Sequence, residues 1–225
     1  AYHEGGHALC AILTPGCDPV HKATIIPRGR ALGLVMSLPE GDRYSKSKSK
    51  CVAELVLAMG GRAAEEIVFG AENVCTGASG DIKMATDQAR RMITEWGMSD
   101  KLGMIAYGDN GQEVFLGHSV TQSKNVSEHT AREIDREVKQ LIDRAYDTAH
   151  SLLLAHIDEL HRLAHALLEH ETLSGDEIRR ILRGETIERV VVDDLAPENR
   201  RASVPTTRDD ATKGNGSLDP SPAIG

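Results

Sequence analysis

The feature that most constrains this chain lies at its start, where residues 3–7 read HEGGH, an HExxH motif. Histidines at positions i and i+4 project from the same face of an α-helix, so they can bind one ion together. Gly5 and Gly6 cost about 1 kcal/mol each in a helix relative to alanine, a penalty that is hard to explain on an ordinary solvated helix. The sequence therefore predicts a helix from residue 1 to residue 13 that binds a metal through His3 and His7.

Zinc is the metal that this motif favours. It accepts neutral imidazole nitrogens at roughly 2.0–2.1 Å and, in catalytic sites, leaves a position open for water. Glu4 follows His3 directly and can reach such a water as a general base and then as a general acid. We therefore expect one Zn²⁺ per chain, bound by His3 and His7, with Glu4 as the catalytic residue.

A third protein ligand must come from downstream, because a catalytic zinc usually has three. The ExxxD spacing of gluzincins is absent, and the HExxHxxGxxH pattern of metzincins is broken at residues 10 and 13. Asp81 follows the flexible run 76–80 and opens a predicted helix, although an acid there is also favoured by the helix dipole alone. The residues by themselves leave the third ligand open among four carboxylates, Glu54, Glu65, Glu66 and Asp81.

Hydrophobic periodicity predicts a mainly α fold with a small β-sheet, a helical zinc-peptidase domain with the HExxH motif. Several segments have apolar residues at helical spacing, and two short β-favouring runs flank a turn. A capping box of Ser174 and Glu177 opens a short last helix. The predicted strands span 23–27 and 32–38, and the longer predicted helices span 48–70, 80–96, 134–145 and 153–168.

Composition indicates which partners are unexpected and where the folded domain ends. The 225 residues include 34 acidic and 26 basic residues, without a basic stripe that could follow a phosphate backbone, so no nucleic acid is expected as a partner. Four cysteines without a CxxC pair indicate free thiols in a reducing compartment. Because large apolar residues become rare beyond residue 196, we expect a folded domain over 1–195 and a flexible tail over 196–225.

Seven short segments resemble one protein family. In order along the chain they read AYHEGGHAL, ATIIPRGRALG, LPEGDRYSKSK, GGRAAEEIVFG, TGASGDI, EWGMSDKLG and ETLSGDEI. In this order they look like the peptidase domain of FtsH and its mitochondrial and chloroplast relatives, and the likeness extends to about residue 185. The family usually has Ala where this chain has Gly5, and often Asn where it has Gly80; neither difference removes a metal ligand, although glycine loosens a helix.

The resemblance implies a role for each candidate residue. His3, His7 and Asp81 become the zinc ligands, and Glu4 becomes the catalytic acid and base. Glu65 and Glu66 become helix residues near the site, where each either supports a ligand or forms a structural ion pair.

The resemblance also implies a longer, membrane-anchored protein. FtsH-like enzymes are ATP-dependent zinc metalloproteases, so we expect hydrolysis of unfolded or ATPase-translocated proteins, membrane proteins included, in quality control and regulated degradation. The resemblance implies a membrane anchor and an AAA ATPase that binds ATP and Mg²⁺ upstream; this chain itself contains no GxxxxGK[ST] segment. The implied assembly is a hexameric ring in a bacterial inner membrane with the peptidase on the cytoplasmic side, ahead of an organelle inner or thylakoid membrane.

Two other classes of protein stay open as alternatives: a non-catalytic module with a relic zinc site, and a stand-alone zinc hydrolase. Glu4 argues against the first, because a structural site fills all four positions and needs no free carboxylate. The run 31–38 is either the free edge of the sheet, where an extended substrate could pair its backbone, or an interior strand. A second histidine pair, His161 and His165, is assigned to a solvated helix face because Arg162 replaces the glutamate.

Overall fold

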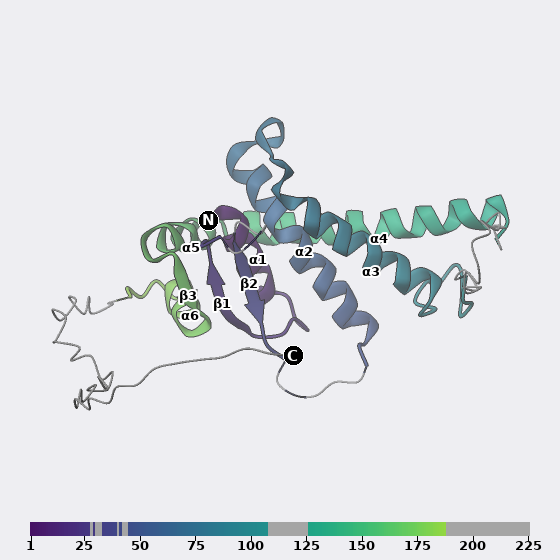
Figure 1. Cartoon of the computed structure of the whole chain (residues 1–225), viewed down its shortest axis with the longest axis horizontal. Helices are drawn as coiled ribbons and strands as arrows, with labels where there is room; N and C mark the ends of the chain where they lie inside the picture. Colours follow the sequence, from purple (N-terminus) through teal and green to yellow (C-terminus); the bar gives the residue numbers. More distant parts are fainter. Residues whose placement is uncertain (28, 30–32, 40, 42–44, 108–125, 188–225) are drawn as a thin grey trace, which may run out of the picture. The chain divides into compact units, whose positions relative to one another are not determined.

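The computed structural model describes residues 1–27, 29, 33–39, 41, 45–107 and 126–187, which form six α-helices, two short 3-10 turns and a three-stranded sheet (Figure 1). The mainly α class with a small sheet is thereby confirmed. The expected domain boundary at residue 195 and the tail over 196–225 lie outside the described residues. The elements are α1 (Tyr2–Leu13), β1 (Val20–Thr24), β2 (Leu34–Ser37), α2 (Lys48–Phe69), η1 (Ala71–Asn73), η2 (Thr76–Ala78), α3 (Ser79–Thr94), α4 (Glu128–Ala155), α5 (Ile157–His170), β3 (Thr172–Ser174) and α6 (Gly175–Leu182).

Helix α1 carries the HExxH motif and is largely buried, from Gly5 to Ala11. It crosses α2 where two glycines meet, since a Cβ built on Gly6 would lie 2.3 Å from the carbonyl oxygen of Gly60, and a Cβ on Gly60 would lie 2.7 Å from the carbonyl oxygen of Gly6. The two backbones therefore touch without a side chain between them, which brings the metal-binding face of α1 close to α2.

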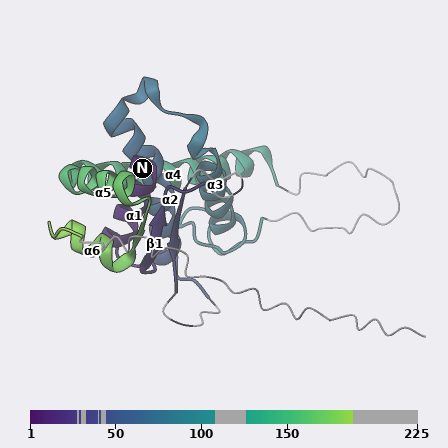
Figure 2. The same ribbon diagram turned by 60° about the vertical axis from the view of Figure 1, so that its left-hand side comes forward.

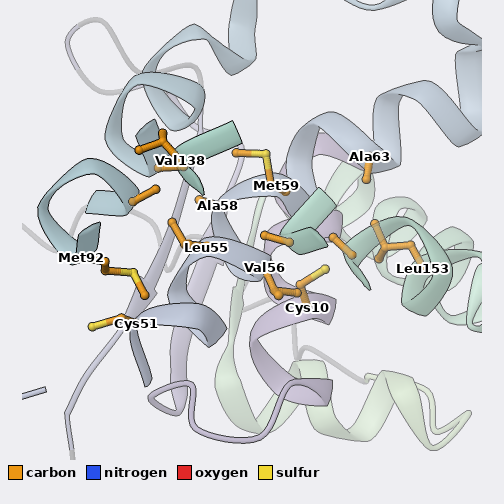
Figure 3. Packing of buried hydrophobic residues seen from close by; sticks show 14 of the residues in the cluster. Cys10, Cys51, Leu55, Val56, Ala58, Met59, Ala63, Met92, Val138 and Leu153 are labelled. Carbon is orange, nitrogen blue, oxygen red and sulfur yellow. The ribbon is translucent and has the colours of Figure 1, made fainter. Parts of the chain in front are cut away.

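Two hydrophobic clusters pack on opposite sides of α1. The larger one lies among α1, α2, α3 and α4, and Figure 3 shows side chains from all four helices converging there. The smaller one joins α1 to the sheet, α5 and α6. Fully buried members of the first include Leu9, Leu55, Met92 and Leu153, and those of the second include Ala8, Ala23, Leu163, Leu173 and Ile178.

The sheet is antiparallel and has the strand order β2-β1-β3. The predicted hairpin is confirmed as β1 and β2, with Ala23 opposite Val35, although β1 begins at Val20, three residues before the predicted start. Strand β3 has only three residues and was not predicted; it pairs Leu173 with Ala23 on the other side of β1. Among the described residues, strand β2 therefore lies at an edge of the sheet. Of the two interpretations of 31–38, the described part of this run agrees with the edge strand and not with the interior strand.

Helix ends follow local capping chemistry. The Ser47 side chain accepts a hydrogen bond from the backbone of Lys50 at the start of α2, and Gly70 with φ 83° ends that helix. The capping box predicted at the start of α6 is present in full. Helix α3 ends at Thr94, two residues before the predicted end at Trp96.

Helix α4 runs behind α2 and α3 in the view of Figure 1. Helices α5 and α6 lie on the β3 side of the sheet, away from β2 (Figures 1 and 2). Contacts between α2 and α4, α3 and α4, and α1 and α5 join these layers. Among the described residues, no helix combines the length and the apolar character that crossing a membrane requires.

Candidate metal centre

Three metal-ligating side chains converge where α1 meets the start of α3. The Nε2 atoms of His3 and His7, one helical turn apart on α1, lie 3.1 Å from each other. Asp81, in the first turn of α3, places its Oδ2 atom 3.3 Å from Nε2 of His3 and 3.5 Å from Nε2 of His7. These three residues form the one group of three or more His, Cys, Asp or Glu side chains in the described part of the chain that could hold a metal ion.

The opposite nitrogen of each ring fixes its orientation. Nδ1 of His7 lies 2.8 Å from the backbone carbonyl oxygen of Leu57, which can only accept a hydrogen bond, so this nitrogen carries the proton. Nδ1 of His3 lies 2.8 Å from Oε1 of Glu65 and donates to that carboxylate in the same way. Each neutral ring then presents an unprotonated Nε2 to the centre of the site, as a metal ligand must.

The donor set fits Zn²⁺. Two imidazole lone pairs and one carboxylate oxygen face each other at 3.1–3.5 Å, an arrangement that is repulsive unless a cation lies among them. Ligand atoms at roughly 2.0–2.1 Å from a tetrahedral ion are roughly 3.3–3.4 Å apart, which matches this spacing. Two nitrogens and one oxygen, with no fourth protein ligand among the described residues, match the donor set of catalytic zinc sites, which leave one position open.

A glycine of α2 makes room for the rings. A Cβ built on Gly61 would lie 2.5 Å from Nε2 of His7 and 2.7 Å from Nε2 of His3, too close for any side chain. Helix α2 thus supplies the floor of the site with Gly61 and orients both rings with Leu57 and Glu65.

The pKa shifts of Asp81 and His3 indicate that the space between the candidate ligands favours a positive charge. Burial alone would raise the pKa of Asp81, but the adjacent imidazoles of His3 and His7 outweigh burial and hold the pKa well below its usual range. Burial would likewise lower the pKa of His3, yet the nearby carboxylates of Asp81, Glu65 and Glu4 raise it overall. A bound cation satisfies the same carboxylates without a proton on the rings.

Glu4 lies beside His3, His7 and Asp81 but does not belong to their group. Its carboxylate packs against Gly33, the residue before β2. Burial raises the pKa of Glu4, and the adjacent His7 and His3 counteract that rise. A carboxylate with a raised pKa next to a metal position is suited to proton transfer.

The other three carboxylates that the sequence offered as ligands lie elsewhere. Glu54 accepts hydrogen bonds from Lys46 and Gln88. Glu66 accepts a hydrogen bond of 2.6 Å from the Tyr146 hydroxyl. Glu65, the buried one, supports His3 from behind instead of pointing its carboxylate at the centre.

Several supporting groups carry no sequence signal. A backbone carbonyl such as that of Leu57 cannot be recognised as a partner before the fold is known, and Gly61 is one of many glycines in the sequence. In the second histidine pair, His165 is exposed, as expected, whereas His161 is half-buried and its Nδ1 lies 2.8 Å from the Tyr2 hydroxyl.

Comparisons with known proteins agree with this geometry. The family model of peptidase family M41 matches residues 1–181. A protein of Caulobacter vibrioides named ATP-dependent zinc metalloprotease FtsH is 62% identical over 184 residues, which are 82% of this chain and 29% of that protein. Proteins of the same name from Magnetococcus marinus and Rickettsia bellii are 49% and 52% identical over 96% and 81% of this chain.

The chain spans about a third or less of the length of these curated relatives, 29%, 32% and 28% respectively. The match to the family model covers the HExxH helix, the sheet and all the described helices up to Ile181 in α6. The chain therefore belongs to peptidase family M41, and its resemblance to the peptidase domain of FtsH is confirmed.

Proposed function

We propose that this chain is the zinc metallopeptidase part of an ATP-dependent, membrane-anchored protease of the FtsH type. The single observation that carries the proposal is the convergence of His3, His7 and Asp81 on one point, with Glu4 beside them and no fourth protein ligand in the described residues. Bound by these three residues, Zn²⁺ would supply a Lewis acid that polarises a peptide carbonyl and acidifies a water molecule.

The chain's own residues then move the proton and hold the substrate. Glu4 accepts a proton from the attacking water and returns it to the departing amine, which would otherwise be a poor leaving group. His3 and His7 are kept in one tautomer by Glu65 and by the Leu57 carbonyl, so no ring needs to reorient during turnover.

An extended substrate is proposed to pair with the edge strand β2. A β-strand added to a sheet edge is recognised through its backbone, which allows many sequences to be bound. Gly33, which precedes β2, contacts the carboxylate of Glu4, so the edge leads directly to the proposed base. An unfolded polypeptide fits this edge, because a folded one has no free backbone to offer.

The remaining parts of the activity belong to a longer protein. The relatives are named ATP-dependent, and each is about three times as long as the segment that it shares with this chain. We propose that the rest supplies an AAA ATPase that uses ATP and Mg²⁺ and a membrane anchor, and that the subunits form a hexameric ring. We further propose a bacterial inner membrane with the peptidase on the cytoplasmic side; the bacterial origin of the relatives supports the bacterial part of this proposal.

Metal analysis and peptide cleavage on three variants test the site. Wild type should bind one zinc per chain and cleave an unstructured peptide. Asp81→Ala should lose zinc, and Glu4→Gln should keep zinc while losing about 100-fold or more of its activity, because an amide cannot accept the proton. Full zinc affinity in Asp81→Ala, with loss in Glu65→Ala, would overturn the ligand assignment; zinc without any cleavage by an oligomeric wild-type preparation would favour the non-catalytic module.

A further inference from the structure

Gly33 occupies a position where a side chain would displace the Glu4 carboxylate from its present place. A Cβ built on Gly33 would lie 2.4 Å from Oε1 of Glu4 and 2.7 Å from both its Cδ and its Cγ. All three of these distances are shorter than real Cβ contacts, so the carboxylate of Glu4 fills the volume that a side chain at residue 33 would need.

The backbone itself does not require glycine at this position. Gly29, in the preceding turn, has φ 63° and therefore a conformation that favours glycine, whereas Gly33 is not in the positive-φ region and any residue could adopt its backbone. Glycine is therefore needed at residue 33 because the Glu4 carboxylate occupies the space of a side chain, and not because the backbone has a left-handed conformation.

We propose that Gly33 is a positioning residue that seats the Glu4 carboxylate between the metal ligands and the edge strand β2. This inference rests on the proposed function, in which Glu4 is the base and β2 binds the substrate. Gly33 directly precedes β2, the strand proposed to bind the substrate, and it also determines the position of the Glu4 carboxylate. One short segment of backbone thus positions both the proposed base and the peptide bond to be cleaved.

The consequence of adding a methyl group follows from the contact distances. Glu4 would have to retreat by roughly 1 Å for its carbon and oxygen atoms to reach normal van der Waals separation from the new Cβ. The clashing atoms, Oε1, Cδ and Cγ, all belong to the Glu4 side chain and none to the backbone, so a rotation of that side chain relieves the clash without moving a helix. A misplacement of about 1 Å in a catalytic site can lower the rate by about 100-fold, so the loss should appear in catalysis and not in stability.

The test compares Gly33→Ala with Gly41→Ala, a second glycine outside the positive-φ region whose added Cβ would meet no described atom within 4 Å. Zinc-loaded proteins are assayed on one unstructured fluorogenic peptide. Gly33→Ala should lower kcat by about 10- to 100-fold, leave KM within twofold, and keep one zinc per chain and the wild-type melting temperature. Gly41→Ala should match wild type, and a crystal structure of Gly33→Ala should show the Glu4 carboxylate displaced.

The outcomes separate this inference from the proposed function. If Glu4→Gln is inactive while Gly33→Ala keeps kcat within twofold of wild type, the positioning role is refuted and the function stands. Loss of zinc or of the fold in Gly33→Ala, or a rise in KM with kcat unchanged, would also refute it, because each indicates a structural or substrate-binding role. Full activity of Glu4→Gln would instead refute the proposed function.

Discussion

His3 is held by a chain of contacts that extends away from the metal centre. Glu65 accepts from Nδ1 of His3 at 2.8 Å, and its other oxygen accepts from the backbone N–H of Cys75 at 3.3 Å. The Cys75 thiol also lies 3.4 Å and 3.5 Å from the two carboxylate oxygens. Burial would raise the pKa of Glu65, but its hydrogen bonds with Cys75 and His3 lower it overall, so the carboxylate stays charged behind the ring.

Replacing Glu65 by glutamine should weaken zinc binding without removing a ligand. The amide oxygen still accepts from His3, but the negative charge that makes the ring a better ligand is lost, so the Kd for zinc should rise by about 10- to 100-fold. Glu66→Gln is the matched control, because Glu66 is the next residue of α2 and accepts its hydrogen bond from the Tyr146 hydroxyl. Zinc affinities from competition with a chromogenic chelator decide it, and equal affinities in the two variants would contradict the supporting role of Glu65.

The sequence predicts the ligands on one helix more firmly than the ligand on another. His3 and His7 are four residues apart, so helical geometry alone places their side chains on one face. Asp81 lies on a different element, and its approach to the histidines depends on how α3 docks on α2, which the residues themselves left open. The resemblance to a family singled out Asp81, and the fold brings it to within 3.5 Å of both rings.

The crossing of α1 and α2 holds the two walls of the metal site together. At this crossing the backbones of Gly6 and Gly60 are in contact, and the two candidate histidine ligands extend from α1 while the groups that orient their rings extend from α2. A change in the separation of these helices would move the imidazoles away from Glu65 and from the Leu57 carbonyl. The positions of the two imidazoles therefore depend on the contact between Gly6 and Gly60.

Gly6→Ala should destabilise the protein although alanine is the better helix former. The new Cβ would lie 2.3 Å from the Gly60 carbonyl oxygen, a backbone atom that can move only if the helices separate. We expect a loss of about 3 kcal/mol or more in the free energy of unfolding. Gly80→Ala is the control in α3, because a Cβ there meets no described atom within 4 Å; it should gain about 0.5–1 kcal/mol.

Denaturant unfolding of both variants with zinc present measures these free energies. Stability of Gly6→Ala equal to or above that of wild type would show that α1 and α2 can separate at no cost. A destabilised Gly80→Ala would show that the start of α3 is constrained by more than helix propensity.

Elements that depend on distant pairing were the hardest to predict. Periodicity over many residues located the long helices, and turn chemistry located the β1–β2 hairpin, because both signals are local. Strand β3 has three residues and exists only because β1, some 150 positions earlier, offers it a partner at Leu173 and Ala23. Its neighbour α6 was predicted, since the capping box of Ser174 and Glu177 is contained in four adjacent residues.

At the scale of the whole molecule, the described residues carry the proposed site of cleavage, and unfolding of the substrate is a separate requirement. The candidate site needs an extended backbone along β2, and a stable protein exposes such a backbone only after losing its cooperative structure, at a cost of about 5–15 kcal/mol. No phosphate-binding GxxxxGK[ST] loop occurs in these 225 residues. The proposed function assigns this work to an ATPase in a longer protein, as the names of the ATP-dependent relatives suggest.

The zinc-loaded chain alone should therefore cleave unfolded polypeptides and leave folded ones intact. One tagged substrate, prepared as a stable folded form and as a permanently unfolded variant, is incubated with this chain and with a full-length relative, each with and without ATP. The chain should degrade only the unfolded form and ignore nucleotide, while the full-length protein should degrade both forms when ATP is present. Gel quantification gives the two rates, and the folded form should be cleaved by the chain no faster than its spontaneous unfolding allows. The backbone of a folded substrate is already hydrogen-bonded within the substrate, so it cannot pair with the edge of β2 until the substrate unfolds. Rapid, nucleotide-independent degradation of the folded form would therefore contradict the ATP-driven proposal and favour a stand-alone zinc hydrolase.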